Sequence, residues 1–263
     1  NAAGGRFDVS GNWDPAGPPG SADTALFNAG GLLNRTVVTF SSDPSVTNKT
    51  ANFTMARYNA SNRWEFVIGD DAGPAVYDAG ATILGGSYLY NADFLLPTGT
   101  LRSSSVALAG YDAMIRLVVE GSNTVWLTTG AWTSDRQTLD FELRGGARLE
   151  AQGQAGTEHK ITTEAIDGNR DREQVIRVTG SGTALIMTNL DTTFTLGGRS
   201  RFELSNGATG RFSKLTLNVS LPPYTVLISN ATLLTKDLVI GNSGTNEIAI
   251  VDAVLQTDSV TIP

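Results

Sequence analysis

Short apolar runs alternate with polar residues along most of the chain, and after residue 175 the runs recur at a nearly constant spacing. One strand-like motif advances by 26, 24 and 22 residues, in Ile176-Arg-Val178, Phe202-Glu-Leu204, Val226-Leu-Ile228 and Ile248-Ala-Ile250. A second motif advances by 21, 23 and 22 residues, in Phe194-Thr-Leu196, Leu215-Thr-Leu217, Leu238-Val-Ile240 and Val260-Thr-Ile262. Two interleaved motifs with one period predict short strands wound into stacked coils, which is a β-solenoid.

The same short strands begin earlier in the chain, with less regular spacing. Candidates before residue 120 are Thr36–Phe40, Asn52–Met55, Trp64–Ile68, Ser87–Tyr90, Val106–Leu108 and Met114–Val119. No segment has helical periodicity over the length of a helix. The chain is therefore predicted to be all-β, with the fold of a right-handed parallel β-helix. A two-sheet β-sandwich is the alternative for residues 32–150, where the period is least regular.

Two segments differ from the repeats in composition. Residues 1–31 are rich in Gly, Pro and Ala, and Trp13 and Phe27 are their large apolar side chains. Prolines exclude helix there, and we expect this segment to cap the core of the first coil. Residues 32–263 then form the solenoid domain. Residues 154–174 hold the densest charge, which predicts a charged loop inserted in the solenoid wall.

The opening run has the form W-x-P followed by P-G-x-x-D-x-A-x-F. It is carried by Trp13, Pro15, Pro18, Asp23, Ala25 and Phe27, and the repeat turns are Asn206-Gly-Ala208, Asn230-Ala231 and Asp252-Ala253. Together they resemble bacterial secreted proteins with autotransporter-associated β-strand repeats. The resemblance covers the N-terminal segment and the regular C-terminal repeats. It implies an extracellular right-handed parallel β-helix and says nothing of activity.

Charge and cysteine content narrow the function classes. The formal net charge of −7 disfavours a nucleic-acid partner. The chain has no cysteine, which excludes disulfides, thiolate metal sites and cysteine nucleophiles. No apolar run reaches the roughly 18 residues of a membrane-spanning helix. The first residue is Asn1 rather than Met, so we expect either a fragment or a chain whose signal peptide has been removed, located outside the cell or at its surface.

Candidate chemistry is sparse. His159 is the only histidine, and because no G-x-S-x-G motif accompanies it, we expect an exposed loop side chain. Asp167, Asn169 and Asp171 resemble the start of a calcium loop, but Arg172 stands where the turn glycine belongs. A charged loop with internal ion pairs is favoured over a calcium site there. No nucleotide-binding motif is present, and no cofactor is expected.

Glycans provide the alternative function. Parallel β-helices often host polysaccharide-degrading enzymes, and Asp140, Glu142 and Arg144 form a charged face of the kind that such chemistry uses. Any solvated sheet also shows outward charges, and fold analogy alone does not establish activity. The aromatic candidates for stacking on sugars are Trp64, Tyr88, Trp126 and Trp132, for which core packing is the favoured interpretation. The possible glycosylation sequons are at Asn34, Asn48, Asn52, Asn59, Asn218 and Asn230.

The leading hypothesis is a non-catalytic extracellular structural protein. It would be a self-associating β-solenoid subunit of a cell-surface filament, matrix or layer, or an adhesin stalk. No polar cap follows the strand Val260-Thr-Ile262. Val260 and Ile262 are therefore predicted to dock head to tail onto another copy of the chain. The alternative hypothesis is a glycan-binding or polysaccharide-degrading surface protein.

Overall fold

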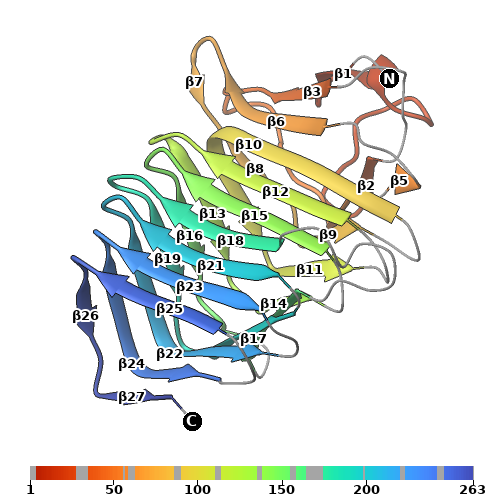
Figure 1. Ribbon diagram of the computed structural model, residues 1–263. Coiled ribbons are helices and arrows are strands. Elements are labelled where there is room, and N and C mark those ends of the chain that lie inside the picture. The colour runs from red at the N-terminus through yellow and green to blue at the C-terminus, as the bar shows by residue number, and fades with distance from the viewer. Residues whose placement is uncertain are drawn as a thin grey trace.

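The computed structural model describes residues 4–27, 35–55, 57–58, 63–85, 90–109, 114–134, 138–154, 158–163, 174–197, 199–219, 223–241 and 246–262. Short strands from these residues stack along one axis, with the two termini at opposite ends of the stack (Figure 1). Nearly all of the pairings are parallel, so the chain is a parallel β-solenoid, as predicted.

Each regular coil contributes one strand to each of three stacks, which we call ladders A, B and C. Ladder A comprises β1 (Gly4–Arg6), β3 (Arg35–Phe40), β6 (Arg63–Asp70), the first half of β10 (Tyr90–Ser103), β12 (Met114–Glu120), β15 (Thr138–Arg144), β18 (Gln174–Thr179), β21 (Ser200–Ser205), β23 (Tyr224–Ser229) and β25 (Asn246–Val251).

Ladders B and C form the other walls. Ladder B comprises β8 (Val76–Asp78), the second half of β10, β13 (Thr124–Thr128), β16 (Arg148–Ala151), β19 (Ala184–Met187), the first halves of β22 (Thr209–Val219) and β24 (Thr232–Ile240), and β26 (Val254–Gln256). Ladder C comprises β2 (Thr24–Phe27), β4 (Asn52–Met55), β9 (Ala81–Gly85), β11 (Ser105–Ala109), β14 (Trp132–Ser134), β17 (Glu158–Thr163), β20 (Asp191–Leu196), the second halves of β22 and β24, and β27 (Ser259–Thr261).

The β-sandwich alternative for residues 32–150 is wrong. Phe94 pairs with Leu117 and Leu117 pairs with Phe141 in parallel register, one coil apart. A sandwich of hairpins would instead pair neighbouring strands in antiparallel register. In the described part of the chain, antiparallel pairing is confined to β5 (Arg57–Tyr58) with β10 and to β6 with β7 (Gly73–Pro74).

The first repeat motif predicts the register of ladder A correctly. Val178, Leu204, Ile228 and Ile250 pair in succession from coil to coil. The second motif is misaligned at its first step, because Phe194, and not Leu196, pairs with Leu217. Alternate residues of a strand share a face, so a slip of two residues keeps the apolar pattern and cannot be detected from it.

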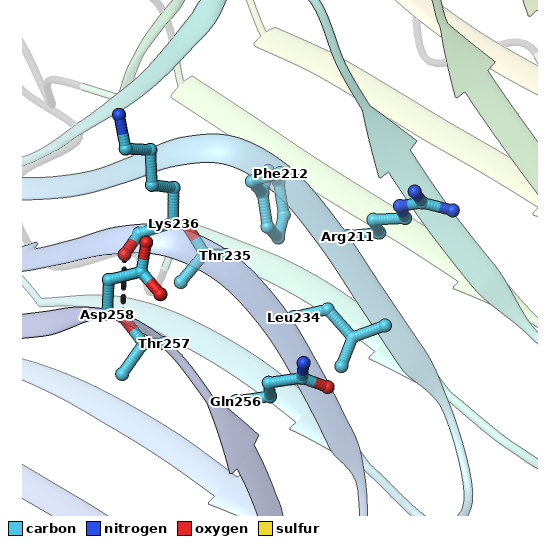
Figure 2. A pocket seen from close by; sticks show the side chains of 8 residues that line it. All are labelled: Arg211, Phe212, Leu234, Thr235, Lys236, Gln256, Thr257 and Asp258. Atoms are coloured by element: carbon cyan, nitrogen blue, oxygen red, sulfur yellow. Dashed lines mark hydrogen bonds between the residues drawn. The ribbon is translucent and has the colours of Figure 1, made fainter.

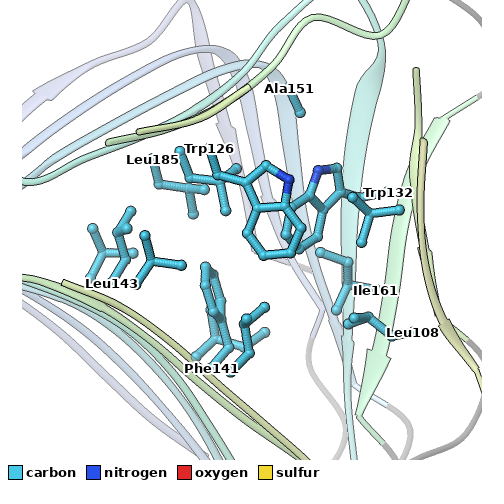
Figure 3. Packing of buried hydrophobic residues seen from close by; sticks show 14 of the residues in the cluster. Leu108, Trp126, Trp132, Phe141, Leu143, Ala151, Ile161 and Leu185 are labelled. Atoms are coloured by element: carbon cyan, nitrogen blue, oxygen red, sulfur yellow. The ribbon is translucent and has the colours of Figure 1, made fainter. Parts of the chain in front are cut away.

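Inward-facing side chains of all three ladders fill the interior. From Phe7 to Phe141 the core is largely aromatic, and Trp126 and Trp132 lie with ring centroids 4.9 Å apart (Figure 3). Beyond β15 the interior consists mainly of Leu, Val and Ile, interrupted by Phe194, Phe202 and Phe212. The core therefore continues without a break from the N-terminal to the C-terminal coils.

Corners between ladders A and B require a left-handed backbone. Asn206, Asn230 and Asp252 adopt φ values of 57°, 46° and 50° there, one coil after another. Asparagine and aspartate tolerate this conformation better than other side-chain-bearing residues. These residues are the turn positions of the recognised repeat, so their recurrence follows from backbone geometry.

The N-terminal segment both extends the ladders and covers the core. β1 joins ladder A and β2 joins ladder C, and between them lies the short 3-10 helix η1 (Ser10–Asn12). The Trp13 indole lies 5.1 Å from the Phe7 ring and 5.5 Å from the Phe27 ring, between centroids. Its Nε1 donates a hydrogen bond of 2.7 Å to the Phe7 carbonyl oxygen. Trp13 thus anchors residues 7–23 across the end of the solenoid.

Candidate functional site

The coil of residues 246–262 exposes an unusual amount of apolar side chain. Val254, Ile262 and Val260 are 60%, 55% and 46% exposed. Ile250 is 43% exposed although it pairs with Ile228, which is fully buried. The same inward position is therefore buried in one coil and open in the next, because nothing in the described structure stacks beneath residues 246–262. This coil is the candidate docking edge.

The backbone of this coil is also open on one side. β25 pairs with β23, and β26 and β27 both pair with β24. Among the described residues these strands have no partner on their other side, and an edge of this kind pairs readily with another strand. At the opposite end of the solenoid, β1 pairs with β3 and β2 pairs with β4, again on one side only within the described residues.

The charged face predicted from Asp140, Glu142 and Arg144 lies on the outer surface of ladder A. Arg144 Nη2 is 2.6 Å from Glu120 Oε2, and Arg144 Nη1 is 3.0 Å from Glu142 Oε2. Arg116 Nε lies 3.6 Å from Asp140 Oδ2. Positive and negative side chains therefore alternate from strand to strand, and each of these carboxylates has an arginine beside it.

The same network continues through β18 and β21. Arg177 Nε donates to Glu203 Oε2 at 3.1 Å, and Arg201 Nη2 lies 3.2 Å from the same oxygen. Burial alone would raise the pKa of Glu203, but hydrogen bonds from Ser205 and Arg177 outweigh burial and lower the pKa. Glu203 therefore stays ionised and is not suited to donate a proton near neutral pH.

The expectation of an exposed loop histidine is wrong. His159 lies in β17 and is fully buried, because the run Glu158-His159-Lys160-Ile161 alternates and turns His159 and Ile161 inward. The Trp132 backbone N–H donates to His159 Nδ1 at 3.2 Å. Nε2 has no hydrogen-bond partner of standard geometry, although the nearby Thr188 backbone slightly favours the protonated ring. Burial dominates and lowers the pKa of His159.

Core packing is confirmed for the described tryptophans among the candidate sugar platforms. Trp126 and Trp132 are almost completely buried, and Trp64 is 6% exposed. Trp126 Nε1 donates to Ser103 Oγ at 3.0 Å, and Trp132 Nε1 donates to Thr128 Oγ1 at 3.0 Å. These indoles cannot stack on a sugar at the surface. Tyr88 lies outside the described residues.

The calcium candidate is not placed by the structure. Asp167, Asn169 and Asp171 lie outside the described residues, as does most of the predicted charged loop. Its first part, residues 158–163, is strand β17 of ladder C. Among the described residues, no group of three or more His, Asp or Glu side chains is arranged to hold a metal ion.

The sequons occupy different environments. Asn48 Nδ2 donates to the Ser41 carbonyl oxygen at 2.8 Å, a bond that an attached sugar would remove. Asn52 Nδ2 donates to Thr24 Oγ1 at 3.2 Å. Asn218 and Asn230 are exposed, on β22 and at a corner. Asn34 and Asn59 lie outside the described residues.

A pocket of about 430 Å³ lies where ladders B and C meet, near the C-terminal end (Figure 2). Sequence analysis did not find it. The signal was present, since Arg211, Leu234 and Gln256 face outward at one register position on three successive coils. The other lining residues are Phe212, Thr235, Lys236, Thr257 and Asp258.

A second pocket, of about 550 Å³, lies beside the β6–β7 hairpin. Asp70, on its wall, accepts hydrogen bonds from the Ser42 backbone N–H at 3.1 Å and from the Ser42 hydroxyl. These bonds lower the pKa of Asp70. Asp70 therefore has local partners that account for its charge.

Comparison of this chain with known proteins gave no match among protein-family models, curated proteins or solved structures. The described residues contain no helix that is long and apolar enough to cross a membrane. The parallel β-solenoid and its open coil are therefore the basis for a functional proposal.

Proposed function

We propose that this chain is a non-catalytic structural subunit of an extracellular or cell-surface assembly, and that it self-associates head to tail through residues 246–262. The observation that carries the proposal is the exposed apolar side chains of that coil, above all Val254, Val260 and Ile262. Burying apolar surface is favourable, and edge strands pair readily, so a further stacked coil would stabilise this end.

The opposite end offers matching strands. β25 and β1 belong to ladder A, and β27 and β2 belong to ladder C. In the proposed contact, β25 of one copy continues ladder A of the next copy at β1, and β27 continues ladder C at β2. Such a contact joins two different surfaces, so it builds an open filament unless the rotation closes a ring.

The charge pattern supports a structural role. On the outer face of ladder A, Glu120, Glu142 and Glu203 are each paired with arginine. General acid–base cleavage of a glycan needs two carboxyl groups held in different protonation states. Uniformly paired carboxylates serve solubility and strand-to-strand cohesion instead.

Sedimentation velocity over a range of protein concentrations, with electron microscopy of the same samples, tests the proposal. We expect wild type to form larger species as its concentration rises, and the double variant Val254→Lys, Val260→Lys to remain monomeric. The matched control is Val76→Lys, since Val76 is 40% exposed on ladder B far from this coil, and it should assemble like wild type. Strictly monomeric wild type at high concentration, in every salt condition, would contradict self-association.

A further inference from the structure

The pocket where ladders B and C meet holds two cations without a carboxylate partner. Arginines that form ion pairs in the described structure are Arg6, Arg102, Arg116, Arg144, Arg148, Arg177 and Arg201. Arg211 and Lys236 lie within ion-pair distance of no described carboxylate, although both line this pocket. In a chain with a net charge of −7, two uncompensated cations on one pocket create a local positive field.

The two cations stand on opposite sides of the pocket. Arg211 extends from one side, together with Leu234 and Gln256, and Lys236 lies on the other side with Asp258 (Figure 2). Arg211 pairs with Leu234 and Leu234 with Gln256, so this side rises over three stacked strands at about 4.8 Å each. A single small anion on one cation would leave the other without a partner.

We propose that this pocket binds a stretch of acidic oligosaccharide that carries carboxylates on neighbouring sugar residues. One carboxylate pairs with the planar guanidinium of Arg211, which suits two-point binding, and the next pairs with Lys236. The Leu234 side chain supplies an apolar surface for a sugar ring. The Gln256 amide and the Asp258 carboxylate bind hydroxyl groups, a task that a site for a plain anion would not give to a carboxylate.

The proposal does not rest on assembly, because a soluble monomer presents the same pocket. It also does not require catalysis, since none of these residues has a shifted protonation state in its argument. The Thr257 hydroxyl already donates to the Lys236 carbonyl oxygen at 3.1 Å, and the Asp258 backbone N–H donates to that oxygen at 2.9 Å. These bonds fix the 257–258 turn against β24 and hold Asp258 at the edge of the pocket.

Isothermal titration calorimetry with oligogalacturonate, its neutral methyl ester and sodium sulfate tests the proposal, with self-association followed separately by sedimentation. We expect oligogalacturonate to bind in low salt, and the methyl ester and sulfate to bind far more weakly. Arg211→Gln and Lys236→Gln should each weaken binding by roughly 10- to 100-fold, the range for a hydrogen bond to a charged group. The control Arg148→Gln removes an outward arginine of the same ladder that is already paired with Glu150, and should bind like wild type.

Circular dichroism melts of each variant show whether it folds, so that loss of binding is assigned to the pocket. Binding that is unchanged in both pocket variants would overturn the proposal. So would equal binding of the acidic and neutral oligosaccharides, or binding of sulfate as tight as that of oligogalacturonate. No binding of oligogalacturonate by folded wild type in low salt would overturn it as well.

Discussion

The buried imidazole of His159 should make the solenoid lose stability in mild acid. Its Nδ1 accepts the Trp132 backbone N–H at 3.2 Å, and the ring is fully buried between Trp132 and Thr192 in the inward row of ladder C. Protonating Nδ1 would break that hydrogen bond and place a charge in the core. The pKa of His159 is therefore lowered by burial.

The direction and size of the effect follow from proton linkage. An unfolded histidine has a pKa of about 6.5, so below that pH the unfolded chain binds a proton that the folded chain does not. The stability contributed by the neutral ring is present above pH of about 6.5 and is lost as the pH falls toward the lowered folded pKa. Between pH 7.5 and 5.5 the loss reaches about 1.4 kcal/mol if the folded ring stays neutral throughout.

The matched variant is His159→Asn, because the asparagine oxygen can accept the Trp132 N–H but cannot be protonated in this range. Urea unfolding, followed by the fluorescence of the buried tryptophans, gives the free energy of unfolding of both proteins at each pH. We expect the difference between wild type and variant to shift by about 1.4 kcal/mol in favour of the variant from pH 7.5 to 5.5. Carboxylates such as Glu203 titrate at lower pH and affect both proteins alike.

A difference that does not change with pH would refute this reasoning. It would mean that the folded protein accommodates the imidazolium, by solvating it or by pairing it with a group that now lies elsewhere. The pH-independent part of the difference reports on the Trp132 N–H alone. His159→Leu removes the acceptor altogether, and the unsatisfied N–H should lower stability by about 1–3 kcal/mol at pH 7.5.

Three further substitutions test the coil geometry. Gly99→Ala would place its Cβ 1.9 Å from the Ile68 backbone oxygen at φ +83°, so we expect a loss of more than about 2 kcal/mol in thermal unfolding, whereas Gly11→Ala, which meets nothing within 4 Å, should leave the melting temperature nearly unchanged. Asn206→Ala, at φ 57°, should cost about 1 kcal/mol and Asn206→Gly should restore stability, whereas equal melts for both would contradict the corner argument. Arg144→Gln removes exposed ion pairs with two glutamates and should cost less than about 1 kcal/mol in low salt, and nothing measurable in 1 M NaCl, by urea titration.

Repetition made the fold predictable. Val178, Leu204 and Ile228 lie at equivalent positions of successive coils, and the sequence shows them at nearly equal intervals. The register of ladder C was harder to predict, because Leu196 and Phe194 are both apolar and both inward, and only the backbone pairing decides between them. Periodicity thus establishes which face of a strand is buried, while the register within that face needs the structure.

The environment of polar residues was predicted less well, because composition does not reveal which face of a strand a charged run supplies. Glu158, His159 and Lys160 look like a loop when counted by charge, yet they alternate, and only the middle one is inward. Arg211 and Gln256 were missed for a related reason: they are ordinary surface residues until stacking places them side by side. A site on a solenoid is spread over several coils, so no short motif marks it.

The length of each coil reflects what fills it and what leaves the wall. Trp64 to Phe94 is a step of 30 residues in the aromatic part of the core, whereas Val226 to Ile248 is a step of 22 in the aliphatic part. Regular coils expose identical edges, and an edge that fits its own neighbour within the chain also fits a neighbour from another chain. The short, regular coils near residues 246–262 are therefore better suited to stacking than the wide N-terminal coils, where Trp13 covers the core. This asymmetry gives the solenoid a direction, which is what head-to-tail assembly requires.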